Sequence, residues 1–143
     1  MKNLIMALAS TLMMIACTQQ QPAQPTSAID EAKTQEVLDR HMKAFQENDL
    51  DGIMADYSEE SILVIPDATS RGLAEIRKNF EGAFAAFPKD STTLTITKTV
   101  VTQDMAYIIW NAKTPKFEVP FGTDSFIVRD GKIVRQTFAG VFK

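Results

Sequence analysis

The chain has 143 residues, of which 45% are hydrophobic and 23% are charged, and this length and composition are typical of one globular domain. The formal net charge is −3 and the sequence pI is about 5.1, so the basic surface that nucleic-acid binding requires is not expected. The single cysteine excludes a disulfide within the chain.

Residues 1–16 have a basic start followed by a short apolar run, which is the pattern of a secretory signal peptide. The run is shorter than the roughly 20 residues that cross a bilayer as a helix. We therefore expect an exported chain rather than an integral membrane protein.

Cys17 follows Ala16 directly, and residues 14–17 (MIAC) resemble the lipobox of bacterial lipoproteins. The resemblance implies that Cys17 is acylated and becomes the mature N-terminus, so that acyl chains anchor the protein in the cell envelope. Thr18 in the next position resembles lipoproteins that are sent to the outer membrane, on its periplasmic side. The alternative is an ordinary cysteine within a signal peptide that is cleaved elsewhere.

Residues 17–28 are polar and contain two prolines, so they are predicted to form a tether without a core of its own. The folded domain is then expected over residues 29–143.

Apolar residues spaced three and four apart predict a first helix over about 30–47, with His41 on its apolar row. Asp49 is placed to cap a short second helix. Residues 61–65 (SILVI) follow as a buried strand that ends at Pro66.

Gly72 begins a third helix, whose apolar row includes Phe80, and Pro88 ends it. The hydrophobic period then changes to two, and Asp130-Gly131 between two apolar runs is a hairpin signal. This order predicts an α+β fold, with three N-terminal helices packed on one face of an antiparallel sheet. The four long strands are expected over residues 93–101, 105–112, 117–128 and 133–142.

Segments 45–54 (FQENDLDGIM), 57–61 (YSEES) and 71–76 (RGLAEI) match one family pattern, which extends to the closing hairpin at 129–134 (RDGKIV). Over about residues 33–142 the chain resembles a SnoaL-like domain of the nuclear transport factor 2-like superfamily. The resemblance implies a cone-shaped, cystatin-like α+β barrel with a pocket between the sheet and the helices, often in a homodimer. Members include ketosteroid isomerases, polyketide cyclases, dehydratases and non-catalytic binding domains, so the fold alone does not determine the function.

The ketosteroid isomerases of this family use an aspartate before a proline as the general base, and a tyrosine and a protonated aspartate as hydrogen-bond donors. In this chain Ile65, which cannot accept a proton, stands at the base position, and His41 stands at the tyrosine position. The sheet aspartate is kept as Asp124. Asp67 could serve as a base only in a shifted register, and its place directly after Pro66 favours a turn. The catalytic residues therefore stay open, with His41 and Asp124 as candidates.

His41 is either a core histidine with one partner or an acid–base group of the pocket, and the resemblance places it near Asp124. If Asp130 and Gly131 form a two-residue turn, Arg135 lies diagonally from Asp124 on one face of the sheet. Such a pair would keep Asp124 ionised, unlike the protonated isomerase aspartate. Alternatively, Arg135 meets an acidic ligand.

The sequence therefore predicts a lipid-anchored domain that binds a small apolar or amphipathic molecule without catalysis, and it predicts neither a cofactor nor a metal site. The alternatives are an isomerase, dehydratase or cyclase that uses His41 and Asp124, and an envelope interaction or dimerisation module without a ligand. The expected pocket residues are His41, Phe45, Tyr57, Ile65, Phe80, Phe84, Trp110, Asp124, Phe126 and Arg135.

Overall fold

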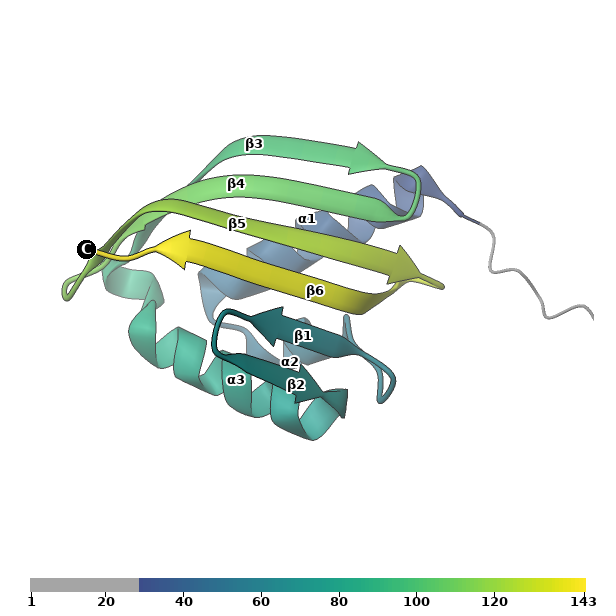
Figure 1. Ribbon diagram of the computed structural model, residues 1–143, viewed down its shortest axis with the longest axis horizontal. Helices are drawn as coiled ribbons and strands as arrows, with labels where there is room; N and C mark the ends of the chain where they lie inside the picture. The colour runs from purple at the N-terminus through teal and green to yellow at the C-terminus, as the bar shows by residue number, and fades with distance from the viewer. Residues whose placement is uncertain (1–28) are drawn as a thin grey trace, which may run out of the picture.

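Helix α1 begins the part of the chain that the computed structural model describes, residues 29–143 (Figure 1). It spans Glu31–Glu47, and the Asp30 side chain caps it by accepting a hydrogen bond from a backbone N–H of the first turn. Asn48 ends it in the left-handed conformation, with a φ of 51°. The predicted signal peptide, the predicted tether and Cys17 lie outside the described residues.

The next elements are short ones around the first strand. Helix α2 spans Leu50–Met54 and is capped by Asp49, as predicted. Strand β1 spans Ile62–Ile65, and a turn at Pro66 and Asp67 joins it to strand β2, Ala68–Arg71. The sequence did not predict β2, whose residues carry no hydrophobic alternation, but its backbone pairs with the whole of β1.

Helix α3 spans Gly72–Ala86 and is followed by a 3₁₀ turn at Lys89–Ser91. The rest of the chain is the predicted meander of four long strands. Their bounds are Thr93–Thr102 for β3, Met105–Lys113 for β4, Glu118–Arg129 for β5 and Lys132–Val141 for β6.

The six strands form one curved sheet in the order β2-β1-β6-β5-β4-β3 (Figure 1). The predicted α+β class is confirmed, with two refinements. Strand β1 pairs with β6 in parallel, so the sheet is mixed rather than wholly antiparallel. The sheet is also not closed, because β2 and β3 form its two edges.

The β5–β6 hairpin contains a bulge that the sequence analysis missed. Asp130 and Gly131 both have positive φ, as a two-residue hairpin turn requires, and Val128 faces Ile133. The register then shifts by one residue, so that Phe126 faces Gln136 instead of Arg135. Because successive residues of a strand point to opposite faces, this shift turns Gln136 inward and Arg135 outward.

The core lies between the inner face of the sheet and the helices, and Figure 1 shows α1 lying across the sheet. Helix α1 contacts β3, β4 and β5, whereas α3 contacts β1 and β2. Within residues 29–143, no helix is long and apolar enough to cross a membrane. The largest buried apolar side chains include Ile53, Ile76, Phe80, Ile108, Trp110, Phe126 and Ile133.

Candidate functional site

A pocket of about 100 Å³ lies between α1, α3 and the inner face of the sheet, and it is partly open to solvent. Its walls are mostly apolar, with aromatic rings from both helices and from three strands. The buried polar side chains in its wall are His41, Asp124 and Gln136. An apolar cavity with a few converging polar groups is the usual form of a small-molecule site.

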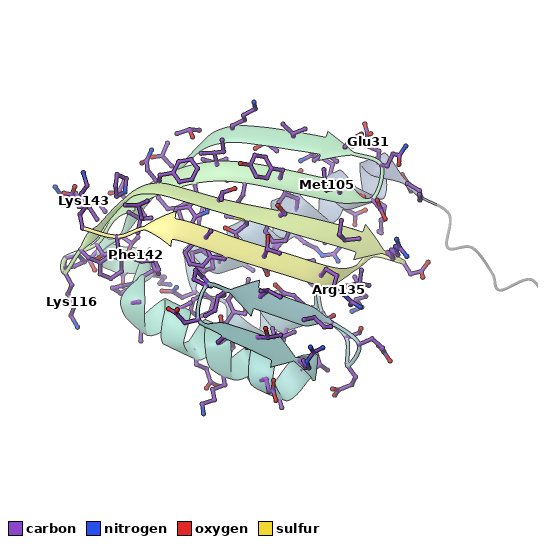
Figure 2. All side chains as sticks on the ribbon, viewed as in Figure 1. Glu31, Met105, Lys116, Arg135, Phe142 and Lys143 are labelled. Atoms are coloured by element: carbon purple, nitrogen blue, oxygen red, sulfur yellow. The ribbon has the colours of Figure 1, made fainter. Side chains whose placement is uncertain are left out.

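Most of the predicted pocket residues lie in this wall, and three do not. Tyr57 is buried behind the wall, and Phe84 packs against the ring of Phe45. Arg135 is exposed on the outer side of the sheet beside β1 (Figure 2), where it donates to the backbone carbonyls of Glu60 and Val134. Those in the wall are His41, Phe45, Ile65, Phe80, Trp110, Asp124 and Phe126.

Asp124, on β5, is held by two N–H donors. Its Oδ2 accepts a hydrogen bond from Trp110 Nε1 at 2.8 Å, and its Oδ1 accepts one from the Gln136 amide at 2.8 Å. The carbonyl oxygen of that same amide accepts from the hydroxyl of Tyr57. A continuous buried chain of hydrogen bonds therefore runs from Tyr57 through Gln136 to Asp124.

The predicted ion pair between Asp124 and Arg135 is wrong, because the bulge places Arg135 on the other face of the sheet. Burial raises the pKa of the Asp124 carboxyl above its ordinary value, and the hydrogen bonds from Trp110 and Gln136, together with the nearby His41, oppose this rise. Arg135 therefore does not act on the Asp124 carboxyl.

The lack of a side chain at Gly122 allows the Trp110 ring to lie against β5. A Cβ atom at residue 122 would lie 2.5 Å from a ring carbon of Trp110, so only glycine allows this close approach. The indole also stacks on Phe138 with an interplanar angle of 18°. Trp110 is thus fixed with its N–H directed at Asp124.

His41 faces inward from α1, as its place on the apolar row predicted, and is 2% exposed. It lines the same pocket as Asp124, but its hydrogen-bond partner is Asp56, whose Oδ2 lies 3.1 Å from Nδ1. Asp56 is fully buried just after α2, and its Oδ1 accepts a hydrogen bond from Arg40 Nε. His41 therefore has one partner, as a core histidine does, and also lines the pocket.

Asp56 and Gln136 are the two polar residues of this region that the sequence analysis missed. Asp56 lies in a polar stretch after a short helix, where an aspartate is normally solvated. Gln136 faces inward only because of the bulge in β6. Neither position carries a local pattern that distinguishes it from a surface residue.

We predict that Asp124 makes stability depend on pH. Between the ordinary aspartate pKa of 3.8 and the raised pKa of Asp124, the folded protein binds more protons than the unfolded chain. The contribution of Asp124 is therefore complete below about pH 4 and is lost as the pH rises through its folded-state pKa. In urea titrations from about pH 4 to about pH 7, Asp124→Asn should become progressively more stable relative to the wild type. Parallel profiles would contradict the assignment.

Comparisons with known proteins agree with this architecture. Residues 38–136 match the family model of the SnoaL-like domain. A candidate ketosteroid isomerase from Kribbella flavida is 17% identical, with a TM-score of 0.67 over 79% of this chain and 81% of that one. A candidate polyketide cyclase from Sinorhizobium meliloti is 20% identical, with a TM-score of 0.64 over 73% and 94% of the two chains.

An NTF2-like protein of unknown function from Mesorhizobium loti is 24% identical, with a TM-score of 0.67 over 78% of this chain and 93% of that one. No curated protein matches the chain. At these identities the solved structures establish the fold only. The family match and the curved sheet covered by helices together identify the chain as a member of the SnoaL-like domain family, within the NTF2-like fold.

Proposed function

We propose that this domain binds a small apolar or amphipathic molecule, with the polar end of the molecule against His41 and Asp124. The observation that carries the proposal is the pocket itself, in which an apolar wall surrounds buried polar groups from α1, β5 and β6. Aromatic and aliphatic walls supply affinity, whereas a few fixed polar groups supply orientation.

The pocket volume limits what enters. About 100 Å³ is smaller than the roughly 150 Å³ cavity that holds benzene in an engineered protein. The pocket therefore accommodates one end of a ligand, a short chain or a small ring, and the rest extends through the part that is open to solvent. This favours an elongated molecule with a small terminal group.

Ile65 supports binding without catalysis. It lines the pocket at the position where the family resemblance places the isomerase base, and its side chain has no group that takes up a proton. The isomerase reaction of the family would therefore need another base in this chain.

A second candidate is an isomerase, dehydratase or cyclase that uses His41 and Asp124. One observation supports it: a histidine paired with a buried carboxylate and an aspartate with a raised pKa line one pocket. Groups with perturbed pKa values that line a pocket are typical of catalytic sites.

Native mass spectrometry of the purified full chain tests both candidates. A retained molecule, identified after extraction, supports the binding function. Conversion of that molecule by the wild type but not by Asp124→Asn would replace binding with the enzymatic candidate. Repeated purification with no retained molecule, and no binding in a library of small amphipathic compounds, would contradict both and favour the interaction or dimerisation module.

We also propose that the domain is anchored at Cys17 to the periplasmic side of the outer membrane. Labelling cells with a radioactive fatty acid should mark the wild type and leave Cys17→Ser unmarked, because the serine hydroxyl does not replace the thiol in lipidation. Fractionation should recover the wild type with outer membranes, since more than one acyl chain holds a protein stably. Equal labelling of both proteins would exclude the anchor.

A further inference from the structure

Asp56 is a fully buried carboxylate that lies outside the pocket wall and has a partner on each oxygen. Arg40 donates to Oδ1 through Nε and also donates to the backbone carbonyl of Gly131. Oδ2 lies 3.1 Å from Nδ1 of His41. The three side chains thus form a line from the protein surface, through Asp56, to the pocket.

This arrangement determines which nitrogen of His41 carries the proton. An ionised carboxylate only accepts hydrogen bonds, so Nδ1 must be the N–H that faces Asp56. The guanidinium of Arg40 already supplies the positive charge opposite Asp56, and no charge on His41 is needed to balance it. In a neutral ring with a proton on Nδ1, Nε2 has a free lone pair and accepts hydrogen bonds.

Nε2 is the ring nitrogen available to the pocket. The two ring nitrogens lie on different edges of the ring, and Nδ1 is engaged with Asp56, which does not line the pocket, whereas His41 does. Edge-to-face contacts with Tyr57, Phe80 and Phe126, at centroid distances of 5.7, 5.8 and 5.4 Å, fix the ring plane. Among the described residues, Thr92 Oγ1 is the only fully buried side-chain nitrogen or oxygen without a partner, so Nε2 is not sealed in the core.

The neighbouring N–H donors are directed at Asp124. Trp110 Nε1 and one N–H of the Gln136 amide donate to its carboxylate, at 2.8 Å each. Among the three buried polar side chains of the wall, the Nε2 of His41 is therefore the acceptor that no side chain of the wall already occupies.

We propose that Asp56 is a positioning residue that fixes His41 in the tautomer with the proton on Nδ1, so that the pocket recognises a ligand through a hydroxyl or N–H donated to Nε2. This inference rests on the proposed binding function and specifies its ligand class: small alcohols and amines rather than ketones or ethers. It reverses the polarity expected from an isomerase site, in which donors meet a carbonyl oxygen.

The test uses the imidazole nitrogens of His41, which is the only histidine of the chain. On ¹⁵N-labelled full-length protein at about pH 8, where histidine is ordinarily neutral, long-range ¹H–¹⁵N correlation spectra identify the protonated nitrogen. We expect Nδ1 to carry the proton and Nε2 to be bare. A ring with the proton on Nε2, or on both nitrogens, would overturn the inference even if ligands bind.

Cyclohexanol and cyclohexanone are matched probes, because they have the same ring and differ only in whether the oxygen donates. Cyclohexanol should shift the Nε2 resonance and bind at least about threefold more tightly than cyclohexanone, as one added hydrogen bond implies. Equal or tighter binding of cyclohexanone would overturn the inference and leave the binding function intact. Failure of both probes, and of the library above, would instead reject the binding function.

Asp56→Asn removes the acceptor-only partner, and it should give a mixture of tautomers and lose the preference for the alcohol. Glu36→Gln is the matched control, because Glu36 lies 3.6 Å from Arg40 on the exposed side and does not contact His41. It should leave the tautomer unchanged. An Asp56→Asn protein that folds and keeps the wild-type tautomer would overturn the role of Asp56, and the wild-type spectra are decisive if the variant does not fold.

Discussion

Replacing Phe80 with alanine is expected to lower the free energy of unfolding by about 3–5 kcal/mol. The ring is 4% exposed and lies where α3 meets α1, in contact with the rings of His41, Phe45 and Tyr57. Its removal leaves a cavity between elements that the backbone holds apart. Because domains are commonly stable by only ~5–15 kcal/mol, a urea titration resolves such a loss readily.

Phe121→Ala is the control for this measurement. Phe121 is 44% exposed near the start of β5, so its removal deletes the same number of atoms without a comparable cavity. The change should be well below that of Phe80→Ala. Similar losses for the two variants would mean that α3 is not packed as the structure describes.

Replacing Asp56 with alanine is expected to cost about 2–4 kcal/mol. The carboxylate is fully buried and bridges Arg40 and His41, so its removal leaves an arginine and an imidazole without their shared acceptor. Arg40 is partly exposed and regains water, which keeps the loss below that of a fully enclosed pair. Denaturant titration at neutral pH measures the effect.

Asp51→Ala provides the comparison, because Asp51 pairs with Arg77 at 3.0 Å but is 91% exposed. An exposed ion pair contributes little, since both ends are well hydrated without it. The two aspartates are close in sequence and differ in burial. If Asp56→Ala were as mild as Asp51→Ala, the buried bridge would not be a structural element.

The sequence predicted the elements that local patterns specify. The Asp49 cap of α2, the apolar rows of the helices and the Asp130-Gly131 turn each depend on neighbouring residues, and all of them are present. Strand β2 was missed because its pairing with β1, not its own side chains, makes it a strand. The parallel pairing of β1 with β6 joins segments that are distant in the chain and leaves no local trace.

In the candidate site, too, the positions that a local pattern or the resemblance specifies were predicted. The helical spacing predicted that His41 faces inward, and the family resemblance predicted that Asp124 lines the same pocket. The bulge in β6 could not be predicted from the sequence, because it inserts one residue into a strand whose alternation of apolar and polar residues fits either register equally well. Because of this one-residue shift, Gln136 faces inward in place of Arg135. The partner of Asp124 is therefore a neutral amide and not a charged guanidinium.

The proposed function requires that the pocket between α1, α3 and the sheet holds a small molecule. Ala83→Phe tests it most directly, because Ala83 lines the pocket and a phenylalanine ring there fills it. Ala85→Phe adds the same ring at an exposed position on the same helix. Native mass spectrometry should find the retained molecule in the wild type and in Ala85→Phe, and should not find it in Ala83→Phe. Undiminished retention by a folded Ala83→Phe protein would contradict the claim.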